Sequence, residues 1–180
     1  RDMKPSSLFT TALAAILAPG ASAPVQAEPM RFACDAPSGR VTGFQIPVDA
    51  KRFRIVGTVK PAAFRPHESF TPTATVELRA RGANNKMVMQ LVAPSAQAAG
   101  ANLTLRQING SDDKSSPVGN LAIGKVVNFG IIYNEGGENQ FLVGEQVFTS
   151  QGSLSGQKEL AVSCSTGDFV FEQLDWGTGE

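Results

Sequence analysis

Two glutamates are the residues of this chain that could cleave a glycosidic bond. Glu77 and Glu172 each stand in the middle of a segment with the alternating pattern of a β-strand. Glycoside hydrolases place two carboxylates about 5 to 10 Å apart across the scissile bond. Two strands of a concave sheet could present this pair to each other, one as the acid and one as the nucleophile or base. The alternative is that both side chains occupy ordinary outward positions.

Other chemical signals are weak. The only histidine, His67, stands in a loop-like segment, and no Gly-x-Ser-x-Gly motif accompanies it, so we expect a plain surface residue. Asp112 and Asp113 follow the turn Asn109-Gly110 and could offer oxygen ligands to calcium. A solvated turn explains them as well, because Lys114 stands where an EF-hand requires glycine. The sequence therefore predicts no metal site and no cofactor.

Two aromatic residues could stack on a sugar ring. The chain has eleven Phe, which favour a core, against one Trp and one Tyr. Tyr133 precedes a turn-like stretch at residues 134–139, and Trp176 stands near the C-terminus. We predict Trp176 and Tyr133 as candidate ligand contacts, with the alternative that Trp176 covers the end of the fold.

The first 27 residues read as a signal peptide. Residues 8–18 are apolar, which suits a signal h-region and is shorter than the about twenty residues that span a bilayer. Cleavage after Ala23 would leave Pro24 first, so we favour cleavage after Ala27. A buried N-terminal helix is the alternative, although proline and glycine end the run at once. The remainder, residues 28–180, is predicted to be one domain without a membrane span, periplasmic or secreted.

The two cysteines, Cys34 and Cys164, lie near the ends of that domain. An even pair in an oxidising compartment is most simply a disulfide. Each cysteine lies in a strand-like segment, so the bond would make the first and last strands neighbours. Two buried free thiols are the alternative.

The net charge is zero, which argues against nucleic acid as a partner. The two halves nevertheless differ: residues 28–106 carry eleven Lys/Arg and five Asp/Glu, and residues 107–180 carry three and ten. If the halves interleave in space, these charges neutralise each other. The alternative is a bipolar surface that docks a charged partner.

Alternation with a period of two runs through most of the chain after the leader, and no helical period interrupts it. About ten strands at a spacing near ten residues predict an all-β, antiparallel two-sheet β-sandwich of the jelly-roll type. The polar stretch 111–120, with its proline and glycine, is predicted to be a loop. The expected strands are residues 30–34, 52–60, 73–81, 86–93, 102–108, 125–133, 140–143, 146–148, 159–164 and 168–176.

Three of these segments together resemble the concanavalin A-like and laminin G-like jelly rolls. They are the early strand 53–59, the hairpin 126–144 that ends in a glycine, and the closing strand 168–174. The chain is also similar to small exported proteins of Gram-negative bacteria that share an early Cys and a late Cys-Ser-Thr-Gly-x-Phe, here residues 164–169. These resemblances imply a fold and leave the function open.

Three functions fit these observations. The first is an exported, non-catalytic domain that binds a glycan or a protein partner outside the cytoplasm. The second is a glycan-cleaving hydrolase that uses Glu77 and Glu172. The third is a structural envelope protein without a small-molecule site. The missing catalytic motifs favour the first.

Overall fold

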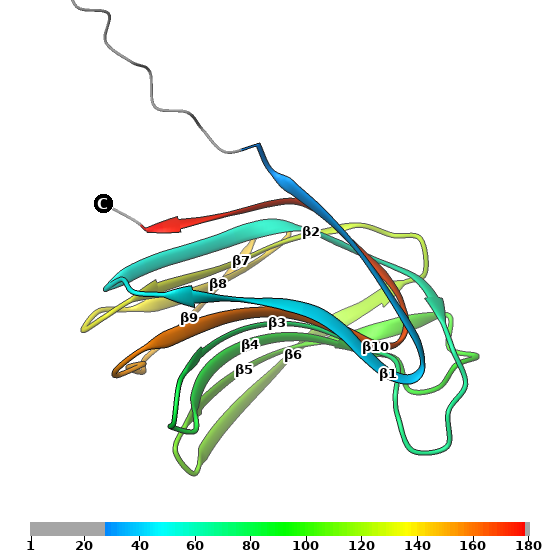
Figure 1. Ribbon diagram of the computed structural model, residues 1–180, viewed down its shortest axis with the longest axis horizontal. Coiled ribbons are helices and arrows are strands. Elements are labelled where there is room, and N and C mark those ends of the chain that lie inside the picture. Colours follow the sequence, from blue (N-terminus) through cyan, green and yellow to red (C-terminus); the bar gives the residue numbers. More distant parts are fainter. Residues whose placement is uncertain (1–27, 179–180) are drawn as a thin grey trace, which may run out of the picture.

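The computed structural model describes residues 28–178, and this part of the chain is built from strands and loops (Figure 1). The all-β prediction is confirmed, and ten strands are present. The proposed signal peptide, residues 1–27, lies outside the described residues. Within them, no helix has the length and apolar character needed to cross a membrane. The strands are β1 (Met30–Val48), β2 (Arg52–Phe64), β3 (Thr73–Ala80), β4 (Asn85–Val92), β5 (Gly100–Asn109), β6 (Asp112–Ala122), β7 (Val127–Asn134), β8 (Asn139–Val143), β9 (Gln146–Ser150) and β10 (Lys158–Thr178).

The first and last strands each belong to two layers. The early part of β10 pairs with β3 and with the late part of β1, whereas the late part of β10 pairs with β2 and with the early part of β1. The first layer therefore has the order β6-β5-β4-β3-β10-β1, and the second has the order β1-β10-β2-β7-β8-β9. All pairs are antiparallel, and one ten-stranded sheet of the described residues curls into these two layers, in agreement with the predicted β-sandwich.

The passage of β10 from one layer to the other occurs at residues 165–167. The sequence suggested a turn between two strands there, but the structure has one strand that bends. Thr166 adopts a left-handed conformation with a φ of 52° at this bend, and the β1 register shifts opposite it, where Gly39 has a φ of 70°. A polar Ser-Thr-Gly run therefore marks a bend here and not a strand end.

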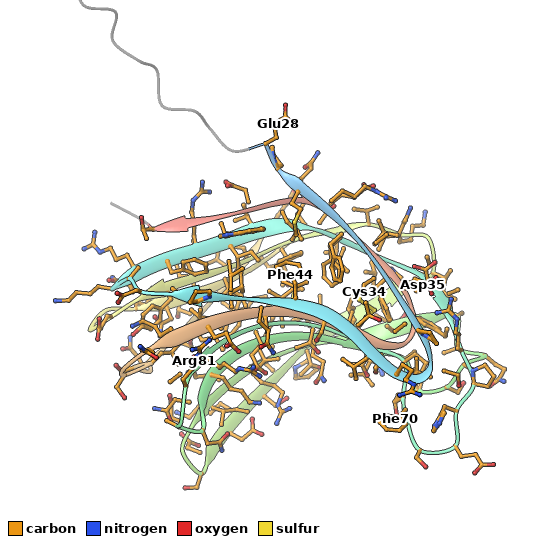
Figure 2. All side chains as sticks on the ribbon, in the orientation of Figure 1. Glu28, Cys34, Asp35, Phe44, Phe70 and Arg81 are labelled. Atoms are coloured by element: carbon orange, nitrogen blue, oxygen red, sulfur yellow. A yellow bond between two sulfur atoms is a disulfide. The ribbon has the colours of Figure 1, made fainter. Side chains whose placement is uncertain are left out.

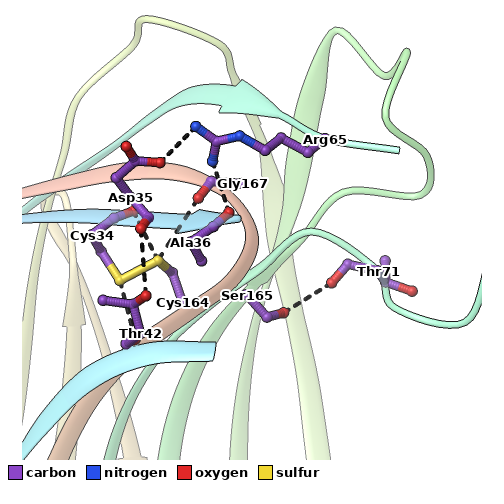
Figure 3. Close-up of a disulfide and its surroundings, with 9 residues drawn as sticks. All are labelled: Cys34, Asp35, Ala36, Thr42, Arg65, Thr71, Cys164, Ser165 and Gly167. Atoms are coloured by element: carbon purple, nitrogen blue, oxygen red, sulfur yellow. Dashed lines mark hydrogen bonds and ion pairs between the residues drawn. A yellow bond between two sulfur atoms is a disulfide. The ribbon is translucent and has the colours of Figure 1, made fainter. Parts of the chain in front are cut away.

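The predicted disulfide is confirmed, and it joins the two layers. Cys34 lies in the part of β1 that belongs to the second layer, and Cys164 lies in the part of β10 that belongs to the first (Figure 3). Their Cα atoms are 6.0 Å apart, and both residues are buried in the core between the layers. The expectation that the first and last strands are neighbours is also correct.

One predicted loop is wrong. Residues 111–120 belong mostly to β6, which pairs along its length with β5 and forms an edge of the first layer. Its side chains are nearly all exposed, so the apolar alternation that announces a strand is missing. Pro117 is tolerated because an edge strand leaves one row of backbone groups unpaired.

Candidate functional site

The outer face of the first layer is the hollowed surface of the molecule. Both layers arch in the same direction, and the first lies on the inside of the arch (Figure 1). Three outward-facing residues of this layer, Glu77, Glu159 and Ala161, are less than 10 % exposed, although no third layer covers them within residues 28–178. This burial is what a concave sheet produces, because neighbouring side chains crowd together on its inner curve.

A cleft of about 550 Å³ lies on this face, over β1, β10 and β3. Small side chains form its centre, because Gly43 pairs with Ser163, which in turn pairs with Thr75. Planar polar side chains from β1 and β3 border it, namely Gln45, Glu77 and Arg79. We call this surface the concave cleft; its residues are Val41, Gly43, Phe44, Gln45, Thr75, Glu77, Arg79, Ala161 and Ser163.

A chain of ion pairs runs beside the cleft. Glu77 accepts hydrogen bonds from Arg79 at 3.2 Å and from Lys86 at 3.3 Å. Glu159 accepts from Arg79 through Oε1 and from Arg81, at 2.8 Å and 3.1 Å, through Oε2. These five residues form the ion-pair ladder, with three cations and two carboxylates, and Arg81 lies toward one end of the layer (Figure 2).

Strand alternation explains why the ladder exists. Residues 77, 79 and 81 are two apart, so their side chains share one face. Register then places Glu159 opposite Arg79, and Lys86 opposite Arg79 on the other side. Gln45 extends the network: in the amide orientation that satisfies its neighbours, it accepts from Arg79 Nη2 at 2.9 Å and donates to Glu159 Oε1 at 3.3 Å.

The ladder holds one carboxyl firmly in its charged form. Hydrogen bonds from Arg79, and then from Arg81, keep the pKa of Glu159 below its usual range, against the opposing effect of burial. The same contact with Glu159 raises the pKa of Arg79. A carboxyl of this kind is a poor proton donor at neutral pH, because general acids need a raised pKa.

The predicted carboxylate pair is not brought together. Glu77 lies on the concave face, where its side chain is 12 % exposed, beside Ala161 of β10. Glu172 lies eleven residues further along β10, beyond the bend, in an exposed ion pair with Arg31 on the outside of the second layer. The two layers therefore separate these carboxylates, and no glycosidic bond could lie between them.

Of the two predicted aromatic contacts, Tyr133 is fully buried and Trp176 is partly buried. Tyr133 has no exposed surface, and its hydroxyl exchanges hydrogen bonds with the backbone of Leu154, so its ring cannot stack on a ligand. Trp176 packs against the core, with its ring 5.9 Å from that of Phe44, which fits the alternative that it covers one end of the sandwich.

The aspartates considered for calcium are paired with cations. Asp113 forms a salt bridge with Arg106, which lowers the pKa of Asp113, and Asp112 lies 3.6 Å from Lys114. Within residues 28–178, no group of three or more metal-binding side chains converges.

The charge asymmetry between the halves is neutralised in space. Five ion pairs join an arginine of residues 28–106 to an acid of residues 107–180: Arg31–Glu172, Arg54–Asp175, Arg79–Glu159, Arg81–Glu159 and Arg106–Asp113. The interleaving interpretation accounts for these contacts, and a bipolar surface is not needed to explain the sequence.

Sequence reasoning missed most of the cleft. Gln45 and Glu159 lie far in the chain from Arg79 and Arg81 and join them only through the pairing of β1, β10 and β3. The alternating polar positions of residues 75–81 were the one available signal.

No family model matches this sequence, and none of the curated proteins does. Solved structures show what the fold resembles. The alginate lyase from Alteromonas sp. 272 is 11 % identical, with a TM-score of 0.61 over 87 % of this chain and 90 % of that one. Alginate lyase PA1167 from Pseudomonas aeruginosa is 10 % identical, with a TM-score of 0.61 over 86 % and 84 %. The Emp46p carbohydrate recognition domain is 12 % identical, with a TM-score of 0.58 over 83 % of each chain. The fold is therefore a concanavalin A-like jelly roll.

Proposed function

We propose that this chain is an exported, non-catalytic domain that binds a glycan in the concave cleft. The observation that carries the proposal is the cleft itself: about 550 Å³ of open space on an uncovered, inward-curving sheet, bordered by amide, carboxylate, guanidinium and hydroxyl groups. Polysaccharides are extended chains covered with hydroxyl groups. An open groove lined by planar hydrogen-bonding side chains fits such a ligand.

The cleft is held ready for a ligand. The ladder and Gln45 fix the bordering side chains through hydrogen bonds before any ligand arrives. A preordered site loses less side-chain entropy on binding, which favours affinity. The small residues at its centre, Gly43 and Ser163, leave room for a sugar ring close to the backbone.

The charge of the ladder favours an acidic glycan. Three cations and two carboxylates leave a surplus of one positive charge beside the cleft. The names of the structural neighbours support a glycan ligand, since they include a carbohydrate recognition domain and lyases of alginate, an acidic polysaccharide. Because these neighbours share little sequence identity with this chain, they guide only the choice of oligosaccharide for the binding experiment.

The state of the charged groups supports binding without cleavage. Both carboxylates of the ladder are paired with cations, and the lowered pKa of Glu159 makes that carboxyl a poor proton donor. Tyr133 is buried and His67 does not line the concave cleft, so neither borders a ligand bound in that cleft.

Calorimetric titration with alginate oligosaccharides, and with neutral β-glucan oligosaccharides for comparison, tests this proposal. Thr75→Val removes a cleft hydroxyl at nearly constant volume and should weaken binding about fivefold, which corresponds to roughly 1 kcal/mol for one net hydrogen bond. Thr58→Val, the same change on the outside of the second layer, is the matched control and should leave the affinity unchanged.

Two results would overturn the proposal. Absence of binding to both glycan series would remove the glycan ligand and leave a protein partner or a structural role. Formation of unsaturated uronate or of new reducing ends during the titration would replace the non-catalytic role with a cleaving one.

Export is the second part of the proposal. A disulfide between the first and last strands suits an oxidising compartment. Expression of residues 1–180 in a Gram-negative host should yield a periplasmic or secreted protein that begins at Glu28. An uncleaved chain with free thiols in the cytoplasm would contradict this.

A further inference from the structure

Phe70 is an exposed aromatic ring that the cleft does not use. Among residues 28–178, the large apolar side chains that are clearly exposed are Phe70, at 46 %, and four aliphatic residues. A single exposed apolar side chain is common on protein surfaces, so what distinguishes Phe70 is how its ring is held and what adjoins it. Phe70 lies in the loop between β2 and β3, at the end of the first layer away from Arg81 (Figure 2).

The ring is held in place by its neighbour. The Nδ1 atom of His67 accepts hydrogen bonds from the backbone N–H groups of Ser69, at 3.0 Å, and Phe70, at 3.1 Å. The imidazole ring meets the Phe70 ring edge to face, with the centroids 4.9 Å apart. It also lies close above Gly39, where a Cβ atom would come within 2.5 Å of Nε2. The loop is therefore a shaped element that presents one aromatic ring.

The base of this loop is fastened to the bend that carries the disulfide. Arg65 donates to the carbonyl of Ala36 at 2.7 Å and forms an ion pair with Asp35 at 2.6 Å (Figure 3). Both partners are the residues of β1 that directly follow Cys34. At the other end of the loop, the Ser165 hydroxyl donates to the Thr71 carbonyl at 3.1 Å.

A second hollow adjoins the ring. Residues 65–72 and 94–97 enclose a volume of about 340 Å³, which we call the loop cup. Polar groups from Glu68, Ser69 and Gln97 line it beside the Phe70 ring. Ser165, which holds Thr71, pairs with Val41 at the border of the concave cleft, so the loop cup lies at that end of the cleft.

We propose that the loop cup is a second subsite for the same glycan, in which the C–H face of one pyranose ring packs on Phe70. This inference rests on the proposed function, since it takes the chain bound in the concave cleft and extends it. His67, which also lines the cup, is proposed as a positioning residue, because its Nδ1 atom holds the backbone that presents the ring. The polar groups of the cup then meet the hydroxyl groups at the edge of the sugar.

The test compares short and long oligosaccharides of alginate and of β-1,3-glucan by calorimetric titration. Phe70→Ala should weaken binding of the longer chains about tenfold, which corresponds to roughly 50 Å² of apolar surface, and leave disaccharide binding unchanged. Phe70→Trp, which keeps an aromatic face, should retain the wild-type affinity. Val147→Ala, at an exposed apolar position on β9, is the matched control.

The positioning role of His67 has its own readout. His67→Ala should reproduce the length-dependent loss, and His67→Asn, whose amide oxygen can accept the same N–H groups, should restore part of it. Equal affinities of wild type and Phe70→Ala at every length would overturn the subsite while leaving the cleft proposal standing. A wild-type protein that binds neither series would overturn both.

Discussion

At the scale of the residue, Glu159 shows how a carboxylate can be both buried and charged. It is 6 % exposed, yet two arginines and Gln45 occupy its oxygens. Removal of one partner from a buried ionic network is costly because the other charge stays without compensation. The ladder therefore shapes the cleft and also stabilises the first layer.

The lowered pKa of Glu159 predicts a pH-dependent contribution to stability. A carboxyl whose pKa is lower in the folded than in the unfolded state stabilises the fold above its unfolded pKa, about 4.3, and loses that contribution as the pH falls through the folded pKa. Glu159→Gln should therefore lower the free energy of unfolding most at neutral pH. The difference from wild type should shrink below about pH 4.

Urea unfolding at several pH values measures this difference. Asp113→Asn is the comparison, because the pKa of Asp113 is also lowered by an arginine while its carboxylate is solvent-exposed, and screening should make its effect smaller. A Glu159→Gln effect that is the same at pH 7 and at about pH 3 would show that charge is not what Glu159 contributes.

At the scale of the element, β1 and β10 carry the architecture, and the disulfide ties them together. Its loop spans 130 residues, so it removes much of the freedom of the unfolded chain. Replacement of Cys34 and Cys164 by Ala should lower the free energy of unfolding by roughly 4 to 5 kcal/mol in the chain-entropy model. Urea unfolding of the oxidised wild type and the double variant measures the loss, and a loss below about 1 kcal/mol would contradict it.

The elements also show where sequence reasoning succeeds and where it ends. Alternation located the strands with a buried face, such as β3 and β4, because burial imposes an apolar residue at every second position. Alternation failed for β6, because an exposed edge strand does not require an apolar residue at every second position. It also failed at Thr166, where a polar, turn-like run is a bend within one strand.

The site was harder to predict because no single sequence segment indicates the curvature of the sheet. Alternation puts Glu77 and Arg79 on one face, but the hollow on that face arises from the joint arch of both layers (Figure 1). The same limit explains the wrong prediction that Glu77 and Glu172 face each other. The sequence shows that both residues are mid-strand, but it does not show that they lie in different layers.

At the scale of the whole molecule, sharing β1 and β10 makes the two layers one cooperative unit. Neither layer is complete without both strands, and the inner faces of the layers form a single core. We therefore expect unfolding in a single transition. Trp176 is the only tryptophan and lies in the second layer, so its fluorescence reports on that layer, while far-UV circular dichroism reports on all strands.

Leu78→Ala tests whether the molecule unfolds in a single transition. Leu78 is fully buried in β3 of the first layer and lies far in sequence from Trp176, the fluorescent probe in the second layer. The cavity should cost about 2 to 5 kcal/mol. In a cooperative molecule, urea unfolding curves from fluorescence and circular dichroism should coincide in the variant and shift by the same free energy. A circular dichroism curve that shifted while the Trp176 fluorescence curve stayed in place would show that the layers unfold separately. The shared strands β1 and β10 would then not make unfolding cooperative.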